Sequence, residues 1–290
     1  MIKAALKRLR SMVFWPITMF LDPIREQLDF LYDVVLTEAN TRITAASENP
    51  LSKFGRKIFS QTDEDGITIE ILKRIGIEKG SYAEFGVGDG LENNTIVLAA
   101  LGWSGFWVGN QVLAFNPPAN SRFRYCKQWI TLENIVDTVK QTSTQLGIEK
   151  LDVVSLDLDG NDFYFVERLL QNGVLPSLFI VEYNAKLAPP IEFKIDYDPN
   201  HTWNRDDYFG ASLSTYNRLF EGFNYRLVCC NPHTGANAFF VRNEYAHLFE
   251  DVPKDIEKLF VGPRFYLYRK FAHGRSGKTV EVILKQGAAN

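Results

Sequence analysis

Cysteine is scarce in this sequence of 290 residues, which contains only Cys126 and the adjacent pair Cys229 and Cys230. The number is odd and no Cys-x-x-Cys spacing occurs, so neither a disulfide framework nor a cysteine-based zinc site is expected. Unpaired thiols suit a reducing compartment. We therefore predict a cytoplasmic protein.

Long apolar runs and an excess of one charge are missing as well. No stretch reaches the roughly 20 apolar residues that a membrane-spanning helix needs. The 32 Lys and Arg residues nearly balance the 35 Asp and Glu residues, for a net charge of −3. Such a balance gives no basic footprint for nucleic acid, so we predict neither a membrane span nor a nucleic-acid partner.

The N-terminus is the one region with a local excess of positive charge. Residues 13–21 form an apolar run, and the basic residues before it are Lys3, Lys7, Arg8 and Arg10. The run is too short to span a membrane, and no small-residue cleavage site of a signal peptide follows it. Two interpretations stay open: the segment lies on an anionic membrane surface at the inner face of the membrane, or it folds onto the domain or a partner subunit.

The remaining pattern divides the chain into a helical segment at 1–50, a catalytic domain at 51–263 and a tail at 264–290. Asp22 and Pro23 predict the start of a helix that runs to about Arg42. Its apolar seam could form a homodimer through residues 1–45 or pack against its own domain, and it consists of Ile24, Leu28, Leu31 and Val35. The polar stretch 44–53 predicts a linker.

Apolar runs alternate with helical patterns through the catalytic domain. Predicted strands occupy residues 82–85, 105–108, 125–130, 151–158 and 178–181, and two closing antiparallel strands are expected at 226–229 and 238–242. Alternation of this kind predicts an α/β fold with a doubly wound, mostly parallel sheet. The N-terminal helix is an extension of it.

Three glycines follow the first of these strands at intervals of two residues. Gly86, Gly88 and Gly90 come after Glu84 and surround Asp89, and such a loop lets a ligand approach bare backbone N–H groups. The third glycine of a dinucleotide fingerprint would fall on Leu91, which disfavours a nucleotide-sugar oxidoreductase. The glycines either form a cofactor loop or serve only a tight turn.

Two further polar clusters follow later strands, at 157–162 and 182–184. Carboxyl ends of parallel strands meet at one edge of a sheet, so both clusters should face the glycine loop. Asp157, Glu182 and Asn184 offer oxygen atoms only, which favours Mg²⁺ or a similar cation. The alternative is that Asp157 and Asp159 cap the next helix.

A base is needed if a hydroxyl is to be activated at this edge. His233 lies in a turn-rich loop before a strand, and Asp159 and His201 compete with it for the role. An insert at 186–216, rich in aromatic and turn residues, is placed to cover the cleft as a lid, or it packs as an extra core layer.

Taken together, these motifs resemble the FkbM-type branch of S-adenosylmethionine (SAM) dependent methyltransferases, over about residues 55–245. The residues that carry the likeness are Ser60-Gln61, Glu64-Asp65-Gly66, Glu84-Phe85-Gly86, Asp89-Gly90, Asn94-Thr95, Gly102-Trp103, Gly105, Asp157 to Asp162, Glu182-Tyr183-Asn184, Tyr208 to Ser212 and Gly235 to Val241. The resemblance implies a class I Rossmann-like methyltransferase fold and SAM as the methyl donor. It implies cofactor contacts at Gln61, Glu84, Gly86, Gly88, Asp89, Gly90, Asn110 and Asp157.

The resemblance also implies O-methylation, which we expect on a saccharide hydroxyl. Asn110 stands where this class usually places an acid for the ribose, and an amide holds a hydroxyl less strongly. The 157–159 segment is also similar to the metal-binding strand end of catechol-type O-methyltransferases, although Gly160 stands where that group carries a lysine. The alternatives are a non-catalytic SAM-fold module of a surface-glycan pathway and a methyltransferase for a non-sugar natural product.

Overall fold

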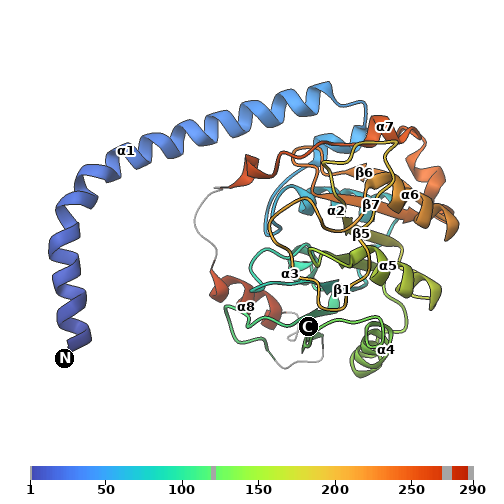
Figure 1. Cartoon of the computed structure of the whole chain (residues 1–290), viewed down its shortest axis with the longest axis horizontal. Helices are drawn as coiled ribbons and strands as arrows, with labels where there is room; N and C mark the ends of the chain where they lie inside the picture. The colour runs from blue at the N-terminus through green and yellow to red at the C-terminus, as the bar shows by residue number, and fades with distance from the viewer. Residues whose placement is uncertain (1, 119–121, 270–275, 287–290) are drawn as a thin grey trace.

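The computed structural model describes residues 2–118, 122–269 and 276–286, with side chains described from Met19 to Lys285. Its centre is a seven-stranded sheet in the order β3-β2-β1-β4-β5-β7-β6 (Figure 1). The strands are β1 (Ser81–Phe85), β2 (Ser104–Gly109), β3 (Phe123–Lys127), β4 (Val153–Leu156), β5 (Leu178–Glu182), β6 (Tyr225–Cys230) and β7 (Asn237–Arg242).

The central strands are parallel and buried on both faces. β1 lies between β2 and β4, and β5 continues the parallel set beside β4. β7 pairs antiparallel with both β5 and β6. This arrangement confirms the predicted α/β class with a mostly parallel sheet, and it is compatible with a Rossmann-like fold. The third strand begins and ends earlier than predicted, at 123–127 rather than 125–130.

Helices flank the sheet in two layers. In Figure 1, α3 (Ile96–Ala100) and α8 (Gly277–Gln286) lie on one side of β1, while α4 (Ile135–Leu146) and α5 (Asp162–Gln171) lie on the other. α8 packs against α3, and its Val280 and Leu284 are buried in the main core. The stretch predicted as a tail therefore contributes to the domain. The other helices of the domain are α2 (Glu64–Arg74), α6 (Leu213–Gly222) and α7 (Ile256–Leu259).

The N-terminal helix is longer than predicted. α1 (Ile2–Ala46) begins at Ile2 and runs through both Pro16 and Pro23, so the start predicted at Asp22 is wrong. Figure 1 shows that α1 extends away from the domain and bends along its length, and prolines bend helices because they lack an N–H donor. The linker predicted at 44–53 is shortened from both ends, because α1 continues to Ala46 and a short 3₁₀ helix (Pro50–Phe54), capped by Asn49, begins at Pro50.

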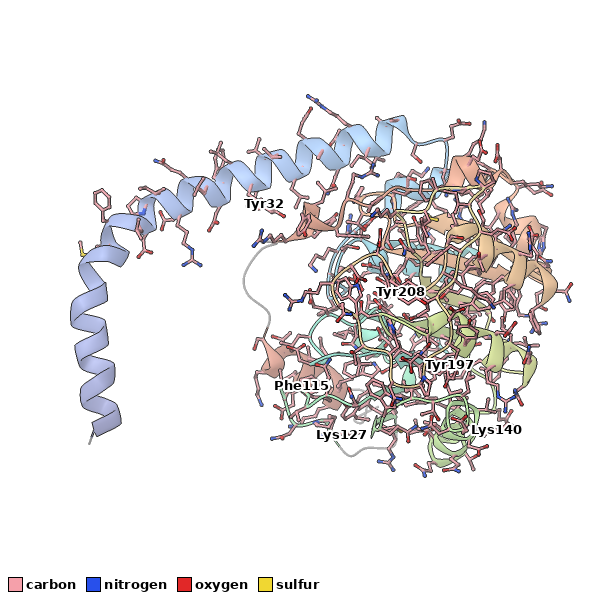
Figure 2. The ribbon with its side chains drawn as sticks, viewed as in Figure 1. Tyr32, Phe115, Lys127, Lys140, Tyr197 and Tyr208 are labelled. Atoms are coloured by element: carbon pink, nitrogen blue, oxygen red, sulfur yellow. The ribbon has the colours of Figure 1, made fainter. Side chains whose placement is uncertain are left out.

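The C-terminal half of α1 is fastened to the domain by the 3₁₀ helix η3 (Phe265–Tyr268). The Tyr32 hydroxyl donates to the carbonyl oxygen of Leu267 at 2.5 Å, and the Asn40 amide donates to the Tyr268 hydroxyl at 3.0 Å. Leu36, between them on the same side of the helix, is buried. Figures 1 and 2 show η3 lying between α1 and the rest of the domain, which holds the helix in place.

Among the described helices, none combines the length and the apolar character needed to cross a membrane. The side chains of the predicted basic segment lie outside the described side chains; they are Lys3, Lys7, Arg8 and Arg10.

Candidate functional site

The loop after β1 exposes its backbone because glycines leave it without side chains. Gly86 and Gly88 have φ values of 86° and 52°, a left-handed region that glycine adopts at little cost. A Cβ on Gly86 would lie 1.5 Å from the carbonyl oxygen of Asp157, whereas a Cβ on Gly88 would meet no heavy atom within 4 Å. Gly86 therefore lets two loops approach each other, and Gly88 leaves open space beside the backbone.

Glu84, at the fourth position of β1, braces the segment that follows the glycine loop. Its carboxylate accepts hydrogen bonds from the backbone N–H groups of Asn94 (2.8 Å) and Thr95 (3.0 Å), and from the Thr95 hydroxyl at 2.5 Å. Burial raises the pKa of Glu84 to about 7, although these hydrogen bonds lower it. Glu84, which is predicted to bind the cofactor, thus links the strand before the glycine loop to the segment after it.

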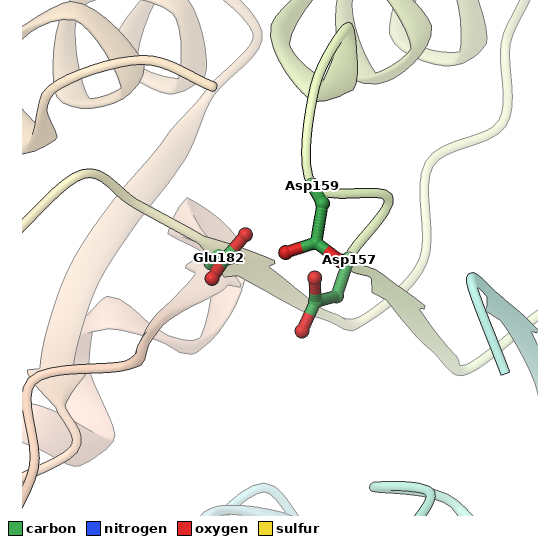
Figure 3. Close-up of side chains that lie close together, drawn as sticks. All are labelled: Asp157, Asp159 and Glu182. Atoms are coloured by element: carbon green, nitrogen blue, oxygen red, sulfur yellow. The ribbon is translucent and has the colours of Figure 1, made fainter. Parts of the chain in front are cut away.

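The loop after β4 is held in shape by Asp162, the first residue of α5. Its carboxylate accepts from the backbone N–H groups of Leu158 at 2.6 Å and Gly160 at 2.7 Å. Asp159 adopts a φ of 54°, which is uncommon for a residue with a side chain. As a result, the side chains of Asp159 and Asp157 both point toward the end of β5 (Figure 3).

Asp157, Asp159 and Glu182 form an acidic cluster at the carboxyl ends of β4 and β5. One carboxylate oxygen from each lies within 4.8 Å of the others (Figure 3). Burial, followed by repulsion among these acids, raises the pKa of Asp157 and Glu182 well above the usual range, and burial raises that of Asp159. Oε2 of Glu182 is buried without a hydrogen-bond partner among the described residues. Acids this close need protons or a cation to offset their repulsion.

The side chain of Asn184, predicted as the third metal ligand, uses only its amide nitrogen in hydrogen bonds to the described residues. Its amide nitrogen donates to the carbonyl oxygens of Asp207 at 2.8 Å and Phe209 at 3.2 Å, and so supports the loop that follows β5. Its Oδ1, the atom that would bind a metal, is buried without a hydrogen-bond partner among the described residues, so its role as a ligand stays a prediction. The structure also places Asp159 beside Asp157 and Glu182.

His233, predicted as a base, is enclosed in a buried network. Its Nδ1 lies 2.8 Å from the Tyr268 hydroxyl and its Nε2 lies 3.3 Å from the Thr44 hydroxyl. Its backbone N–H donates to Asp63, and burial lowers the pKa of His233 to about 4. The loop that carries it is covered by α1 and η3, which the sequence pattern did not place there. His233 is therefore not among the residues that line the cavities described next.

Two adjoining cavities, of about 360 Å³ and about 560 Å³, lie at the carboxyl ends of the strands. The smaller one extends to the ends of β2 and β3, at residues 109–111 and 128–130. The larger one extends past β5 toward Gln61 and η3. The two share a wall that consists of Gly86, Val87, Gly88, Asp157, Asp159 and Trp203.

Of the residues predicted to contact the cofactor, all but Gly90 line at least one cavity. Asn110 lines the smaller one, and Gln61 and Asp89 line the larger one together with Glu84. Gly90 serves packing, because a Cβ there would lie 2.9 Å from Leu113 and 3.0 Å from Phe115.

The irregular segment that follows β5 crosses over the loop that follows β4. The side chain of Asn161 exchanges two hydrogen bonds with the backbone of Asp198, and Trp129 Nε1 donates to the carbonyl oxygen of Pro199 at 3.2 Å. The ring of His201 lies over Gly160, where a Cβ would come within 2.5 Å of it. These contacts pin the predicted lid across the smaller cavity.

The far end of the predicted lid has a different role. Tyr216, which was expected to belong to the lid, is fully buried in α6 and belongs to the core. The irregular covering segment therefore ends at residue 212, directly before the helix.

Several cavity residues were not singled out from the sequence. Trp129 lines the smaller cavity, and Arg205, Phe265 and Tyr266 line the larger one. Arg205 has a φ of 64°, an uncommon backbone conformation for a residue with a side chain, and nothing in the sequence predicts it. The only signal for Phe265 and Tyr266 was the density of aromatic residues in a stretch assigned to a tail.

Comparisons with known proteins leave the family open: no family model matches the chain, and no curated protein matches it. The resemblance drawn from the motifs is thus a hypothesis that the site itself must support.

Proposed function

We propose that the protein is a SAM-dependent O-methyltransferase of the class I type that methylates a saccharide hydroxyl. One observation carries the proposal: the open backbone at Gly88 and the acids that follow β4 and β5 line one pair of adjoining cavities. The strand order, with β7 antiparallel between β5 and β6, is also the order of class I methyltransferases, which supports the assignment.

SAM has two parts, an adenosine and a methionine, joined at a positively charged sulfur. In our proposal the adenosine occupies the smaller cavity, where Asn110 can hydrogen-bond a ribose hydroxyl and Trp129 offers a flat face to the adenine. The methionine part extends past Gly88 into the larger cavity. The sulfonium then lies at the shared wall beside Asp157, whose carboxylate offsets its charge.

The acidic cluster fits a divalent cation such as Mg²⁺. Asp157 and Glu182 supply oxygen ligands, and the unpaired Oε2 of Glu182 is a buried acceptor that such an ion would satisfy. Asn184, the third ligand that we predict, also has a buried Oδ1 without a hydrogen-bond partner among the described residues. When bound, the ion would lower the pKa of the acceptor hydroxyl.

Methyl transfer requires the acceptor oxygen to lose a proton. The oxygen lone pair forms the new O–C bond while the C–S electron pair returns to sulfur, which becomes a neutral thioether. Asp159 is the most exposed of the three acids, so it is the residue placed to receive the proton. His233 is excluded from direct proton transfer by its enclosure behind the cavity wall.

The walls of the larger cavity suit a sugar ring. Its aromatic lining consists of Trp203, Phe209, Phe265 and Tyr266. Flat aromatic faces pack against the C–H surface of a sugar, and they also pack against aromatic natural products. An acceptor screen by mass spectrometry distinguishes these classes, because the acceptor gains the mass of one methyl group.

Calorimetry with S-adenosylhomocysteine tests the cofactor assignment. The wild-type protein should bind it, and Gly88→Arg should not, because the new side chain would start in the open space beside the loop. Gly147→Arg is a matched control: Gly147 also has a left-handed φ and no heavy atom within 4 Å of a Cβ, but it caps α4 away from both cavities. Absence of binding to the wild type, or equal binding to Gly88→Arg, contradicts the proposal.

A second test separates catalysis from binding alone. Asn110 gives the ribose no charged partner, which favours a non-catalytic SAM-fold module that binds glycans. Transfer of label from methyl-labelled SAM to a sugar acceptor would establish the enzyme, and binding without transfer to any acceptor would favour the module. Loss of transfer when a chelator is added, with recovery on Mg²⁺, would show that the transfer needs a cation.

A further inference from the structure

The part of α1 that projects from the domain carries a large exposed apolar surface. Between residues 19 and 35, nine large apolar side chains are exposed over 47% to 75% of their surface. They are Met19, Phe20, Leu21, Ile24, Leu28, Phe30, Leu31, Val34 and Val35. Isolated exposed apolar residues are ordinary, but a contiguous apolar patch marks an interaction surface.

The apolar side chains of this stretch all lie on one broad face of the helix. At about 100° per residue, the nine fall within an arc of about 200°. The remaining arc holds all the charged residues of the stretch, which are Asp22, Arg25, Glu26, Asp29 and Asp33. A two-stranded coiled coil uses a much narrower seam, whereas a wide apolar face opposite a charged face is typical of a helix that lies in a membrane interface.

The apolar face is turned away from the domain. The residues that fasten α1 to the domain, Tyr32, Leu36 and Asn40, continue the charged side of the helix. Figure 2 shows Tyr32 on the side of α1 that faces the domain. The domain therefore cannot cover the apolar face, and a flat surface placed against that face would leave the domain on the other side of the helix.

The charge of the N-terminus favours lipid over a second copy of the chain. α1 begins at Ile2, its first turns contain Lys3, Lys7, Arg8 and Arg10, and the first acidic residue in the sequence is Asp22. A positive segment joined to an apolar face is complementary to an anionic lipid surface. Two parallel copies would instead bring these like charges together.

We propose that α1 docks the protein on an anionic membrane surface. The apolar face of residues 19–35 lies among the lipid chains at the headgroup boundary, and the basic first turns contact anionic headgroups. The charged face and the domain remain in water. This inference does not depend on the proposed methyl transfer, because it uses only α1 and its attachment to the domain.

Sedimentation of the full-length protein with lipid vesicles tests the inference. The vesicles contain equal parts of phosphatidylglycerol and phosphatidylcholine, and vesicles of phosphatidylcholine alone serve for comparison. The variant Leu28→Glu with Leu31→Glu should lower the partition coefficient at least about tenfold. The matched control, Leu101→Glu with Leu248→Glu, makes the same chemical change at exposed apolar positions outside α1 and should bind like the wild type.

The wild type should bind the anionic vesicles more tightly than the neutral ones, and added salt should weaken that binding. Circular dichroism would show that the variants remain folded. A wild type that stays in solution with anionic vesicles, or a Leu28 and Leu31 variant that binds as well as the wild type, overturns the inference. So does light scattering that shows a wild-type dimer, a monomeric variant and no vesicle binding, because a second copy then covers the face.

Discussion

Glu84→Gln should change the way in which stability depends on pH. Glu84 is buried beneath the glycine loop and accepts hydrogen bonds from Asn94 and Thr95. Glutamine keeps the shape and one acceptor oxygen, but it has no proton to lose. The substitution therefore removes the cost of a buried negative charge. It also turns one acceptor oxygen into an NH₂ group that faces a backbone N–H donor, and this adds a cost that does not depend on pH.

The size of the effect follows from the pKa. In the folded protein the pKa of Glu84 is about 7, compared with the usual value of 4.5. Because the folded pKa is raised, the unfolded chain loses its proton first, so this group lowers the free energy of unfolding as pH rises from the lower value to the higher one. At about 1.4 kcal/mol per pKa unit, the loss reaches about 3 kcal/mol above neutral pH.

Urea unfolding of the wild type and Glu84→Gln, from about pH 4 to about pH 8, measures this loss. The free-energy difference between them should shift in favour of the variant by about 3 kcal/mol over that range. Glu250→Gln makes the same change at an exposed position and serves as the matched control. If the difference between Glu84→Gln and the wild type is the same at every pH, Glu84 does not carry a raised pKa and the reasoning fails.

Three further outcomes follow from the site and its supports. Gly86→Ala should lower the free energy of unfolding by about 3 kcal/mol, because its Cβ would overlap the neighbouring loop. Gly88→Ala should lower it by only about 1 kcal/mol, because its Cβ meets open space. Equal losses in urea unfolding would contradict the assigned roles. Mg²⁺ affinity should rise with pH, because the pKa values of Asp157 and Glu182 are raised and the cation must displace their protons. Calorimetry in two buffers of different ionisation enthalpy should detect this proton release. Binding without proton release would show that the cation does not bind at these acids. Tyr268→Phe removes the hydroxyl that links α1 to the domain and should cost about 2 kcal/mol; hydrogen exchange in residues 30–46 should accelerate, and unchanged exchange would show that this hydroxyl does not hold the helix.

The sheet was predictable because its strands are buried on both faces. A strand such as β4 must be apolar at nearly every position, so the run from Leu151 to Leu158 indicated it directly. β3 was placed too late because it is only partly buried, and its pattern is correspondingly weak. The start of α1 was predicted wrongly because a strong local signal was misleading. Pro23 is typical of the first turn of a helix, but here the helix continues through it.

The site was predictable where topology alone brings residues together. Asp157 directly follows β4 and Glu182 ends β5, the neighbouring parallel strand, so their proximity follows from the sheet. Side-chain direction after a turn does not follow from topology, so the sequence did not predict that Asp159 lies beside Asp157 and Glu182. The enclosure of His233 depends on packing by α1 and η3 from opposite ends of the chain, and no local pattern indicates that.

The 3₁₀ helix η3 connects α1 to the wall of the larger cavity. Phe265 and Tyr266 form part of the wall of the larger cavity, while the carbonyl oxygen of Leu267 accepts the hydrogen bond of Tyr32 on α1. A displacement of α1 that moves Leu267 would therefore also move the neighbouring Phe265 and Tyr266 in the cavity wall. If membrane docking of α1 and ligand entry both shift this short segment, linkage requires each to alter the equilibrium of the other by the same factor.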